Sequence, residues 1–592
     1  MVDAICSYKQ LNTALYNRAM AGGLLQLVGK GAQDQLVTGN PSFTHFRSVY
    51  KRHTEFAMEH FRLPFKTTSL KFPTSGTLKL RTKVERYAQL LHDCYLNIDI
   101  PDIYSPVVPV SLTGISGGSI NSSSKAIGYE FQWVRNLGYN MIRYVSILIN
   151  GQEIVRHTGE WMKMYANLTF DANKKAVLDR MVGNTPDLYD PANADDRINQ
   201  YPHAISAYTS YPEPSIRGRN LLIPLHFWFC ETAGQALPLV ALQLSEVEIV
   251  VELRNAYDLF TVRDVRTSGN ISGSNPNFGE RISPDTSVST FNLSHFLSPP
   301  LYETPTVNSI QYLSSWNFDP FIEANYIFVG DSELAYLAKT DHSFLISQVD
   351  MVQAEGQYGP ANDLELTMKN LVTRVVWLAQ RSDSVARNDY DNYTNWKDFN
   401  KSPFTPNAMG WYTTGLVQPD NVNRRDILLE STIILDGKER FAPKETLFFS
   451  GIQLYRHQTG NPIPGVYEYS FALNNDAIQP SGHLNGSMFN KTLLRNTFVS
   501  PPYADDVENG TANTAICVLK STATSKNPLV ITNPNVLGSD GKPIYGPEDI
   551  VTIVRKSATG ETYKYTYTVR AYVQSYNFLR IMGGIGNVVF SS

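Results

Sequence analysis

Residue types that could do chemistry occur in several short motifs, but none of these motifs has the context that its chemistry requires. Residues 114–118 match the Gly-x-Ser-x-Gly pattern of serine hydrolases, which works only where a strand turns sharply into a helix and exposes the serine. Here a polar stretch without helical periodicity follows. Residues 538–543 differ from a phosphate-binding loop in spacing, and Pro543 stands where that loop needs Ser or Thr. Neither segment predicts an enzyme.

Metal-binding residue types are also poorly arranged. His53 and His60 lie close to Glu55 and Glu59 in the sequence. A zinc site needs three or four ligands that converge, and the His-Glu-x-x-His spacing is absent here. We therefore expect no catalytic residue, no cofactor and no metal site.

Composition places the chain among folded globular proteins. Of its 592 residues, 42% are hydrophobic and 18% are charged, so it is too long for one core and too apolar for a disordered chain. The formal net charge of −4 argues against a protein that coats nucleic acid. No two of the four cysteines have a metal-ligand or redox spacing: Cys6, Cys94, Cys230 and Cys517. We expect Cys94 and Cys230 to be buried small hydrophobic residues, in a protein assembled in a reducing compartment.

Asn-x-Ser/Thr triplets are frequent in this Asn-rich chain. Several fall in long polar stretches, where a glycan would find room. The N-terminus shows no secretion signal, so composition alone is expected to explain most of these triplets. The candidate acceptors are Asn121, Asn270, Asn292, Asn392, Asn400 and Asn509.

The elements that would position any site are mostly strands. Apolar and polar residues alternate through residues 78–85, 246–253 and 563–573, which predicts one buried face and one face toward water. Residues 145–155 and 431–441 each place an Asn-Gly or Asp-Gly pair after a β-rich run. Such pairs supply the two positive-φ residues of a type I′ turn, so both stretches predict tight hairpins.

One such hairpin in each half of the chain predicts a β domain that occurs twice. Helical periodicity is limited to residues 11–20 and 331–339. Long polar stretches separate the strands, mainly residues 264–308, 381–425 and 500–548, and loops of this length usually carry function. The pattern indicates an all-β protein of two consecutive eight-stranded antiparallel jelly rolls with long loop insertions.

Several segments, in order along almost the whole chain, resemble one family. They are residues 22–28, 31–41, 49–57, 223–230, 236–243, 469–474, 479–482 and 576–582. These segments are similar to the major capsid proteins of nucleocytoplasmic large DNA viruses, which have a double jelly roll. Two features differ from the family pattern. Residues 1–21 precede the Gly-Gly-Leu segment with which the family usually starts, and the loops are longer than in its compact members.

The resemblance implies a structural protein of a viral icosahedral shell. In this family, three copies form a pseudo-hexagonal capsomer, and capsomers tile the capsid over an inner membrane. The implied partners are further copies of the chain and minor capsid or cement proteins beneath them, with no direct nucleic acid and at most indirect membrane contact. The implied location is the virion, after assembly in the host cytoplasm.

The implied domain organisation has four parts. These are an N-terminal arm at 1–25, a first jelly roll at 26–258, a linker at 259–315 and a second jelly roll at 316–592. Two alternatives stay open, because a fold does not dictate a function. One is a minor capsid or spike protein with the same fold, and the other is a carbohydrate-active β-sandwich protein.

A shell protein acts through its contacts, and aromatic side chains often anchor interfaces. Those in long polar stretches are our candidates for trimer or capsomer contacts: Trp396, Trp411, Tyr412, Tyr201, Tyr208 and Tyr211. Trp133 is expected to pack inside its own sandwich. Trp161, Trp228 and Trp377 lie in strand-like apolar surroundings and are expected in the core.

Overall fold

The structure is a computed structural model, and it describes residues 27–66, 70–105, 129–197, 200–204, 212–264, 281–284, 292–299, 315–357, 361–386, 388–395, 425–499, 520–521, 528–529 and 566–590. The chain divides into two units, residues 1–55 and 56–592. The described part of the first unit holds α3 (Ala32–Thr38), which buries no side chain. The helix expected at residues 11–20 lies outside the described residues.

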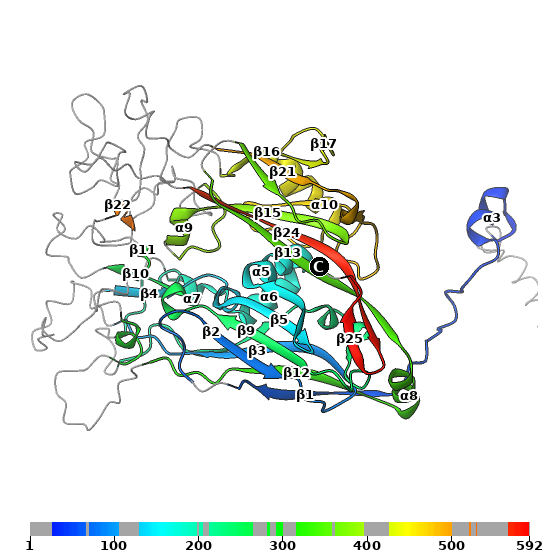
Figure 1. The fold of residues 1–592 in the computed structure, drawn as a ribbon, viewed down its shortest axis with the longest axis horizontal. Coiled ribbons are helices and arrows are strands. Elements are labelled where there is room, and N and C mark those ends of the chain that lie inside the picture. The colour runs from blue at the N-terminus through cyan, green and yellow to red at the C-terminus, as the bar shows by residue number, and fades with distance from the viewer. Residues whose placement is uncertain are drawn as a thin grey trace, which may run out of the picture. The chain divides into compact units, whose positions relative to one another are not determined.

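The first jelly roll (residues 56–329) has two main antiparallel sheets (Figure 1). One has the strand order β1-β12-β3-β7, with β8 beside β3, and the other has the order β2-β9-β5-β6. A small third sheet has the order β11-β10-β4. The strands are β1 (Phe56–Pro64), β2 (Leu78–Lys83), β3 (Leu90–Ile100), β4 (Tyr129–Trp133), β5 (Ile142–Ile149), β6 (Gln152–Thr158), β7 (Arg219–Pro224), β8 (Leu237–Pro238), β9 (Val247–Leu253), β10 (Phe260–Asp264), β11 (Arg281–Ile282) and β12 (Phe321–Val329).

The second jelly roll (residues 342–590) repeats this plan. One sheet has the order β13-β24-β15-β19, with β20 beside β15 and β25 beside β24, and the other has the order β14-β21-β16-β17, with β18 beside β16. The strands β22 and β23 form a separate pair. The bounds are β13 (His342–Gln357), β14 (Ala361–Glu365), β15 (Leu371–Arg381), β16 (Leu428–Leu435), β17 (Lys438–Glu439), β18 (Lys444–Glu445), β19 (Val466–Ser470), β20 (Leu484–Asn485), β21 (Thr492–Phe498), β22 (Lys520–Ser521), β23 (Pro528–Leu529), β24 (Tyr567–Met582) and β25 (Ile585–Val588).

Both predicted hairpins are confirmed. Asn150 and Gly151 have φ angles of 53° and 77° and join β5 to β6. Asp436 and Gly437 have φ angles of 46° and 80° and join β16 to β17. A type I′ turn requires positive φ at both central residues, so each dipeptide determined its turn locally.

The helices lie between strands. The helix predicted at residues 331–339 is confirmed as α8 (Asp331–Lys339). The other helices are α4 (Leu137–Met141), α5 (Gly159–Thr169), α6 (Ala172–Met181), α7 (Pro186–Tyr189), α9 (Ser382–Ala386), α10 (Gln453–His457), the 3₁₀ turns η2 (Trp228–Cys230), η3 (Ala233–Gln235), η4 (Ala256–Asp258), η6 (Leu293–His295) and η8 (Gly486–Met488), and the π-helix η7 (Phe448–Ile452).

The helices α5 and α6 were not expected from the sequence. Each has an ordinary start signal, because the side chains of Thr158 and Asp171 accept hydrogen bonds from backbone N–H groups in the first turn of α5 and α6, respectively. In α5, the apolar residues Trp161, Met164 and Leu168 also have helical spacing. The sequence instead indicated strand-like apolar surroundings for Trp161.

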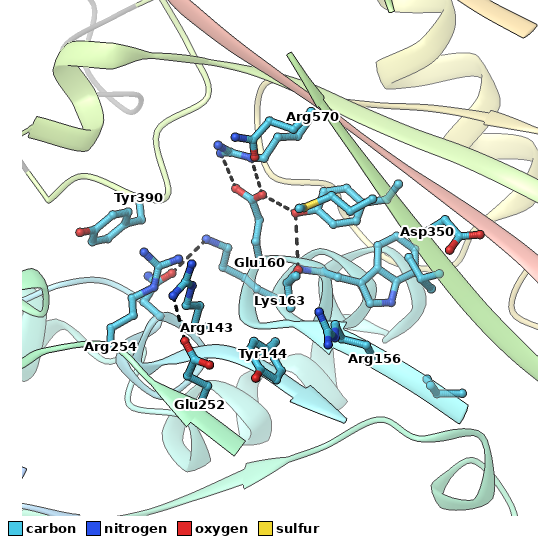
Figure 2. A pocket seen from close by; sticks show the side chains of 18 of the residues that line it. Arg143, Tyr144, Arg156, Glu160, Lys163, Glu252, Arg254, Asp350, Tyr390 and Arg570 are labelled. Atoms are coloured by element: carbon cyan, nitrogen blue, oxygen red, sulfur yellow. Dashed lines mark hydrogen bonds and ion pairs between the residues drawn. The ribbon is translucent and has the colours of Figure 1, made fainter. Parts of the chain in front are cut away.

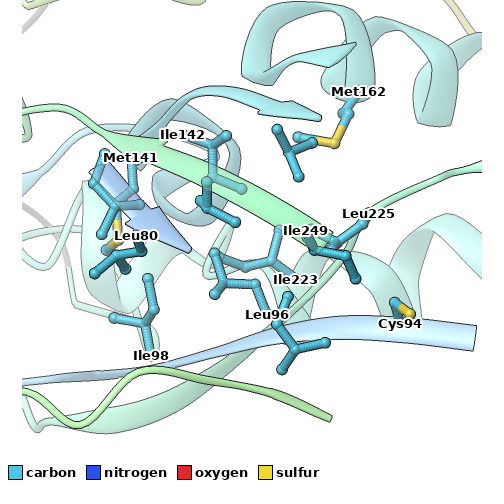
Figure 3. Close-up of a cluster of buried hydrophobic side chains, with 14 of the residues drawn as sticks. Leu80, Cys94, Leu96, Ile98, Met141, Ile142, Met162, Ile223, Leu225 and Ile249 are labelled. Carbon is cyan, nitrogen blue, oxygen red and sulfur yellow. The ribbon is translucent and has the colours of Figure 1, made fainter. Parts of the chain in front are cut away.

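The sheets of the first jelly roll pack face to face over an apolar core. Figure 3 shows Leu80 and Ile249, from one sheet, pointing toward Leu96, Ile98 and Ile223 of the other. All five side chains are fully buried. The alternation read from the sequence in β2 and β9 therefore identified core residues correctly.

The four tryptophans expected in the interior are buried. Trp133 and Trp228 belong to the core of the first jelly roll, and Trp377 belongs to that of the second. Trp161 is 3% exposed but lies on α5, in a smaller apolar cluster that also contains residues of the second jelly roll. Trp161 itself therefore lies on a helix and not on a strand.

The domain boundaries expected from the sequence differ from those of the structure. β12, assigned to the second jelly roll, pairs with β1 along its whole length and also with β3, so the first jelly roll continues to residue 329. β10, assigned to a linker, pairs with β4. The larger unit begins at Phe56 and not at residue 26. These pairings join segments far apart in the sequence, and local composition carries no sign of them.

One strand contributes to both cores. Every second side chain of residues 567–573 on β24 lies in the core of the second jelly roll. Further along the same strand, Leu579 and Ile581 lie in the core of the first. Beyond β24, the backbone carbonyl of Gly584 accepts a hydrogen bond of 3.1 Å from the N–H of Leu244 in the first jelly roll. The two jelly rolls are therefore one packed body.

The junction between the jelly rolls and the candidate assembly surface

The two jelly rolls meet along α5. Its apolar side chains pack against the sheet of the second jelly roll that contains β15 and β24, and the Trp161 ring stacks on that of Tyr572 with centroids 5.5 Å apart. The buried members of this cluster are Trp161, Met164, Leu168, Val376, Leu378, Tyr393, Leu454, Val466 and Tyr572. One helix of the first jelly roll thus supplies an apolar contact to the second.

The Glu160 carboxylate at the start of α5 accepts hydrogen bonds from residues of the second jelly roll. Arg570 donates to both oxygens of Glu160, from Nε at 2.7 Å and from Nη2 at 2.8 Å. The hydroxyls of Tyr572 and Tyr393 donate to the same carboxylate at 2.5 and 2.9 Å. Figure 2 shows Arg570 and Glu160 facing each other across the junction. Such bidentate, charge-assisted hydrogen bonds fix the relative orientation of the guanidinium and the carboxylate as well as their distance.

These contacts change the protonation of the pair. Burial alone would raise the pKa of Glu160, but the charges of Arg570 and Lys163 outweigh it and lower the pKa to about 2. For Arg570, burial would lower the pKa, and the facing Glu160 carboxylate raises it instead. Both groups are therefore charged at neutral pH.

A second ion pair lies deeper in the junction. Lys163 of α5 and Asp391 form a salt bridge in which the two side chains are only 1% and 5% exposed. Asn136 and Asn140 each donate to the Asp391 carboxylate, at 2.6 and 3.1 Å. Buried charges need this kind of complete pairing, because an unpaired one is costly to desolvate.

A third buried charge is Arg374 of β15, which is fully buried. Its Nε donates to the side-chain oxygen of Gln574 at 2.5 Å, and its guanidinium carbon lies 5.5 Å from the centre of the Trp161 ring. The nearest carboxylate oxygen of Glu468 is 3.8 Å from Nη1. Burial raises the pKa of Glu468, and Arg374 opposes that rise. Arg374 and Glu468 therefore add a third pair of opposite charges to the two ion pairs of α5.

A cleft of about 740 Å³ opens beside this junction. One wall comes from β5, β6 and β9, and the other from β13 (Figure 2). On the first wall, Arg143 pairs with Glu252 at 2.9 Å, and Arg156 pairs with Glu153 at 2.8 Å. The wall formed by β13 contributes Asp350, whose pKa is raised by burial.

Among the carboxylates that line the cleft, those of Glu153, Glu160 and Glu252 are each held in an ion pair, and no ion pair is seen among the described residues for Asp350 on β13. In the described part of the chain, no group of three or more His, Cys, Asp or Glu residues could hold a metal ion.

Helices of the described residues are too short or too polar to cross a membrane.

Of the aromatic residues proposed as assembly contacts, Tyr201 is the one that the structure describes, and it is misassigned. Tyr201 is 7% exposed, and its hydroxyl donates to the carbonyl of Phe131 at 2.7 Å and lies 3.0 Å from the Ser105 hydroxyl. It closes a loop over its own jelly roll. The others lie outside the described residues: Tyr208, Tyr211, Trp396, Trp411 and Tyr412.

Of the glycosylation candidates, the structure also describes only some. Asn392 is fully buried, and its side-chain oxygen accepts hydrogen bonds from the N–H and the hydroxyl of Thr394. A glycan has no room there, so this assignment is wrong for the folded subunit. Asn292 is exposed before η6 and remains a candidate. The remaining candidates lie outside the described residues: Asn121, Asn270, Asn400 and Asn509.

Comparison with known proteins identifies the family. Residues 44–291 match a family described as the N-terminus of the major capsid protein, and residues 333–537 match the large eukaryotic DNA virus major capsid protein. This chain belongs to the major capsid proteins of large DNA viruses. Such a capsid protein is a structural component of the icosahedral shell and is found in the virion.

Curated relatives match over most of their length. The major capsid protein of Phaeocystis pouchetii virus is 24% identical over 97% of this chain and 100% of its own. The major capsid protein of Paramecium bursaria Chlorella virus 1 is also 24% identical, with the same two coverages. Probable capsid protein 4 of Acanthamoeba polyphaga mimivirus is 26% identical over 79% of this chain and 91% of its own.

Solved capsid structures share the fold. A quasi-atomic model of the Paramecium bursaria Chlorella virus 1 capsid matches with a TM-score of 0.57 at 20% identity, covering 93% of this chain and 100% of that one. The Faustovirus major capsid protein matches with a TM-score of 0.53 at 13% identity, covering 97% and 98%. The expected double jelly roll is therefore confirmed.

Proposed function

We propose that this capsid protein forms homotrimers that serve as pseudo-hexagonal capsomers and tile the shell over an inner membrane. The main support is the rigid connection between its jelly rolls, which share β24 and the buried ion pairs of Glu160 and Lys163. Three rigid pairs of similar barrels would approximate sixfold symmetry. A trimer closes when each subunit offers two different patches to its two neighbours.

The proposed partners follow from this role. They are further copies of the chain within and between capsomers, and minor capsid or cement proteins beneath them. We propose no direct contact with nucleic acid, in line with the net charge of −4, and at most indirect contact with the membrane. Assembly in the host cytoplasm fits the two cysteines that the structure describes, because Cys94 and Cys230 are free thiols.

We propose no enzymatic activity. The carboxylates lining the cleft beside the junction are used in ion pairs, with the exception of Asp350 on β13. A structural role needs only that these charges hold the two jelly rolls in one orientation.

The solution mass of the purified full-length protein, measured by light scattering, tests the capsomer. We expect a stable species at three times the chain mass of 66.4 kDa. A stable monomer at every protein concentration would contradict the homotrimer. Counting copies per particle then separates a major capsid protein from a minor or spike protein of the same fold, because a major protein dominates the protein mass of the virion.

The loop aromatics give a finer test. Replacing Trp411 by Ala should weaken trimers more than it lowers the midpoint of thermal unfolding, because aromatic side chains often dominate interface energy. Tyr336 on α8 is 60% exposed, and Tyr336→Ala serves as the control for loss of an exposed ring. Equal trimer retention in both variants would contradict a role for Trp411 in assembly.

A further inference from the structure

Cys94 and Cys230 are far apart in the sequence, but the fold brings their side chains together. Cys94 lies on β3, at one end of the row of buried side chains in Figure 3, and Cys230 ends the short turn η2. The two Sγ atoms approach the same carbonyl oxygen, that of His92, at 4.0 and 3.5 Å. Both thiols therefore lie around one backbone oxygen, and a disulfide requires such proximity before it can form.

Backbone and side-chain bonds hold the two segments together on both sides of the thiols. The N–H of Leu225 donates to the carbonyl of Cys94 at 3.2 Å. The His92 ring nitrogen Nδ1 lies 2.8 Å from the carbonyl oxygen of Phe229. Because these contacts fix both backbones, the sulfur atoms can approach by side-chain rotation without separating β3 from η2.

We propose that Cys94 and Cys230 form a redox pair, which is a dithiol during assembly in a reducing compartment and an intramolecular disulfide once the particle reaches oxidising surroundings. The oxidant is a small-molecule disulfide such as oxidised glutathione. The site does not depend on the capsomer, because both cysteines belong to the first jelly roll of one chain.

The reaction balances as two successive thiol–disulfide exchanges. The Cys230 thiolate attacks oxidised glutathione, which forms a mixed disulfide and releases one glutathione thiolate. The Cys94 thiolate then attacks the Cys230 sulfur and releases the second glutathione thiolate. The two protons lost by the protein thiols go to the two leaving thiolates. Two cysteines are oxidised, and one oxidised glutathione is reduced to two glutathione molecules.

The surroundings determine the order of attack. Cys94 is 1% exposed, and its hydrogen bond to Cys230, together with burial, raises the pKa of its thiol. Cys230 is partly exposed, so it is the sulfur that a dissolved oxidant reaches. Cys94 then acts as the resolving thiol, because its sulfur lies beside the same carbonyl oxygen as that of Cys230.

The disulfide would covalently link β3 to η2 and close the long segment between them into a loop. Closing a long loop restricts the unfolded chain more than it restricts the folded one. We therefore expect oxidation to raise the midpoint of thermal unfolding by about 5 °C, as a strain-free cross-link does in a large domain.

The test uses the full chain with Cys6→Ser and Cys517→Ser, so that only the pair remains. The folded protein is reduced with a phosphine, exchanged into buffers of increasing oxidised-to-reduced glutathione ratio, quenched with N-ethylmaleimide and digested for mass spectrometry. We expect both thiols to disappear together, a cross-linked peptide containing Cys94 and Cys230, and no retained glutathione. Heating reduced and oxidised samples should reveal the increase in the unfolding midpoint.

Two further variants keep the outcome interpretable. In Cys230→Ser, Cys94 should stay a thiol at every ratio of oxidised to reduced glutathione, and the oxidised and reduced samples should unfold at the same temperature. In Cys94→Ala, Cys230 should keep a glutathione adduct. Alkylation of both cysteines in the most oxidising buffer would overturn the proposal, as would a stable glutathione adduct on Cys230 beside a free Cys94. A disulfide that leaves the unfolding midpoint unchanged would overturn its stabilising role.

Discussion

The interiors of the jelly rolls and the junction between them are stabilised by different interactions. The cores are apolar, and a truncated side chain there leaves a cavity whose cost depends on how well the neighbours relax. At the junction, Glu160, Lys163 and Arg374 are charged groups with little or no access to water. Losing one partner there leaves a buried charge without compensation. The junction is therefore the region where a single substitution should have the largest effect.

Arg570→Leu should be the most damaging substitution. It removes the cation that pairs with Glu160, and breaking a buried pair in this way typically costs about 3–5 kcal/mol. The matched control is Arg495→Leu, because Arg495 and Asp363 form a two-pronged pair at the surface, with side chains 47% and 41% exposed. That surface pair should be worth about 1 kcal/mol or less. The midpoints of thermal unfolding at equal protein concentration compare the two.

A double variant sharpens this test. Glu160→Gln in the Arg570→Leu background removes the uncompensated charge and still offers an acceptor to the Tyr393 and Tyr572 hydroxyls. The double variant should therefore unfold at a higher temperature than Arg570→Leu alone. If both unfold at the same temperature, the lost packing of the arginine stem, and not the buried charge, explains the damage.

The shared strand β24 allows a comparison of the two cores. Leu579→Ala should destabilise the first jelly roll by about 2–5 kcal/mol, the usual range for a buried leucine. Val569→Ala, on the same strand, should cost less and should affect the second jelly roll. Hydrogen–deuterium exchange would localise each loss of protection. Equal loss of protection across both jelly rolls in each variant would show that the two cores unfold as one unit.

A buried histidine predicts a pH effect. His157 is 3% exposed, and burial lowers its pKa to about 4 from 6.5. Between these values the unfolded chain binds a proton that the folded chain does not, so stability falls as pH drops through this window, by about 3 kcal/mol in full. Thermal unfolding between pH 7 and pH 4 measures this. Burial also lowers the pKa of His226, to about 3, so His157→Leu should make the curve shallower without removing the fall. His60→Leu, at an exposed position on β1, should leave the curve unchanged.

The Glu160 carboxylate affects folding stability in a lower pH range than His157 does. Its folded-state pKa of about 2 lies below its ordinary value of 4.5, so its stabilising contribution is fully present above pH 4.5 and is lost as pH falls toward 2. With both His157 and His226 replaced by Leu, the remaining loss of stability should therefore begin below pH 4.5. A curve that still falls between pH 6.5 and 4.5 would assign the effect to another group.

The two type I′ turns should show the smallest effect. Gly151 and Gly437 both have positive φ, and a methyl group at either position would meet no atom within 4 Å. Gly151→Ala and Gly437→Ala should therefore each cost about 1–2 kcal/mol, from backbone strain alone. Similar decreases in unfolding midpoint are expected for the two variants. A much larger decrease for one of them would reveal a contact beyond the turn itself.

The structure confirms the predictions that rest on local patterns. Alternation in β2, β9 and β24 identified buried residues, and the pairs Asn150-Gly151 and Asp436-Gly437 identified two turns. Predictions about which strand face meets water, and which segments belong to one domain, were less accurate. The polar face of β24 was expected to meet water, but its Arg570 meets Glu160 of α5.

The sequence by itself determined the strands, the two hairpins and the doubled β architecture, because each of these depends on residues close together in the chain. Tertiary structure alone decided that β12 joins the first jelly roll, that Asn392 and Tyr201 are buried, and that the sulfurs of Cys94 and Cys230 lie beside one carbonyl oxygen. Each of these facts depends on which distant segments pair, and pairing is selected by the free energy of the whole packed body. No pattern within a short window of sequence carries that information.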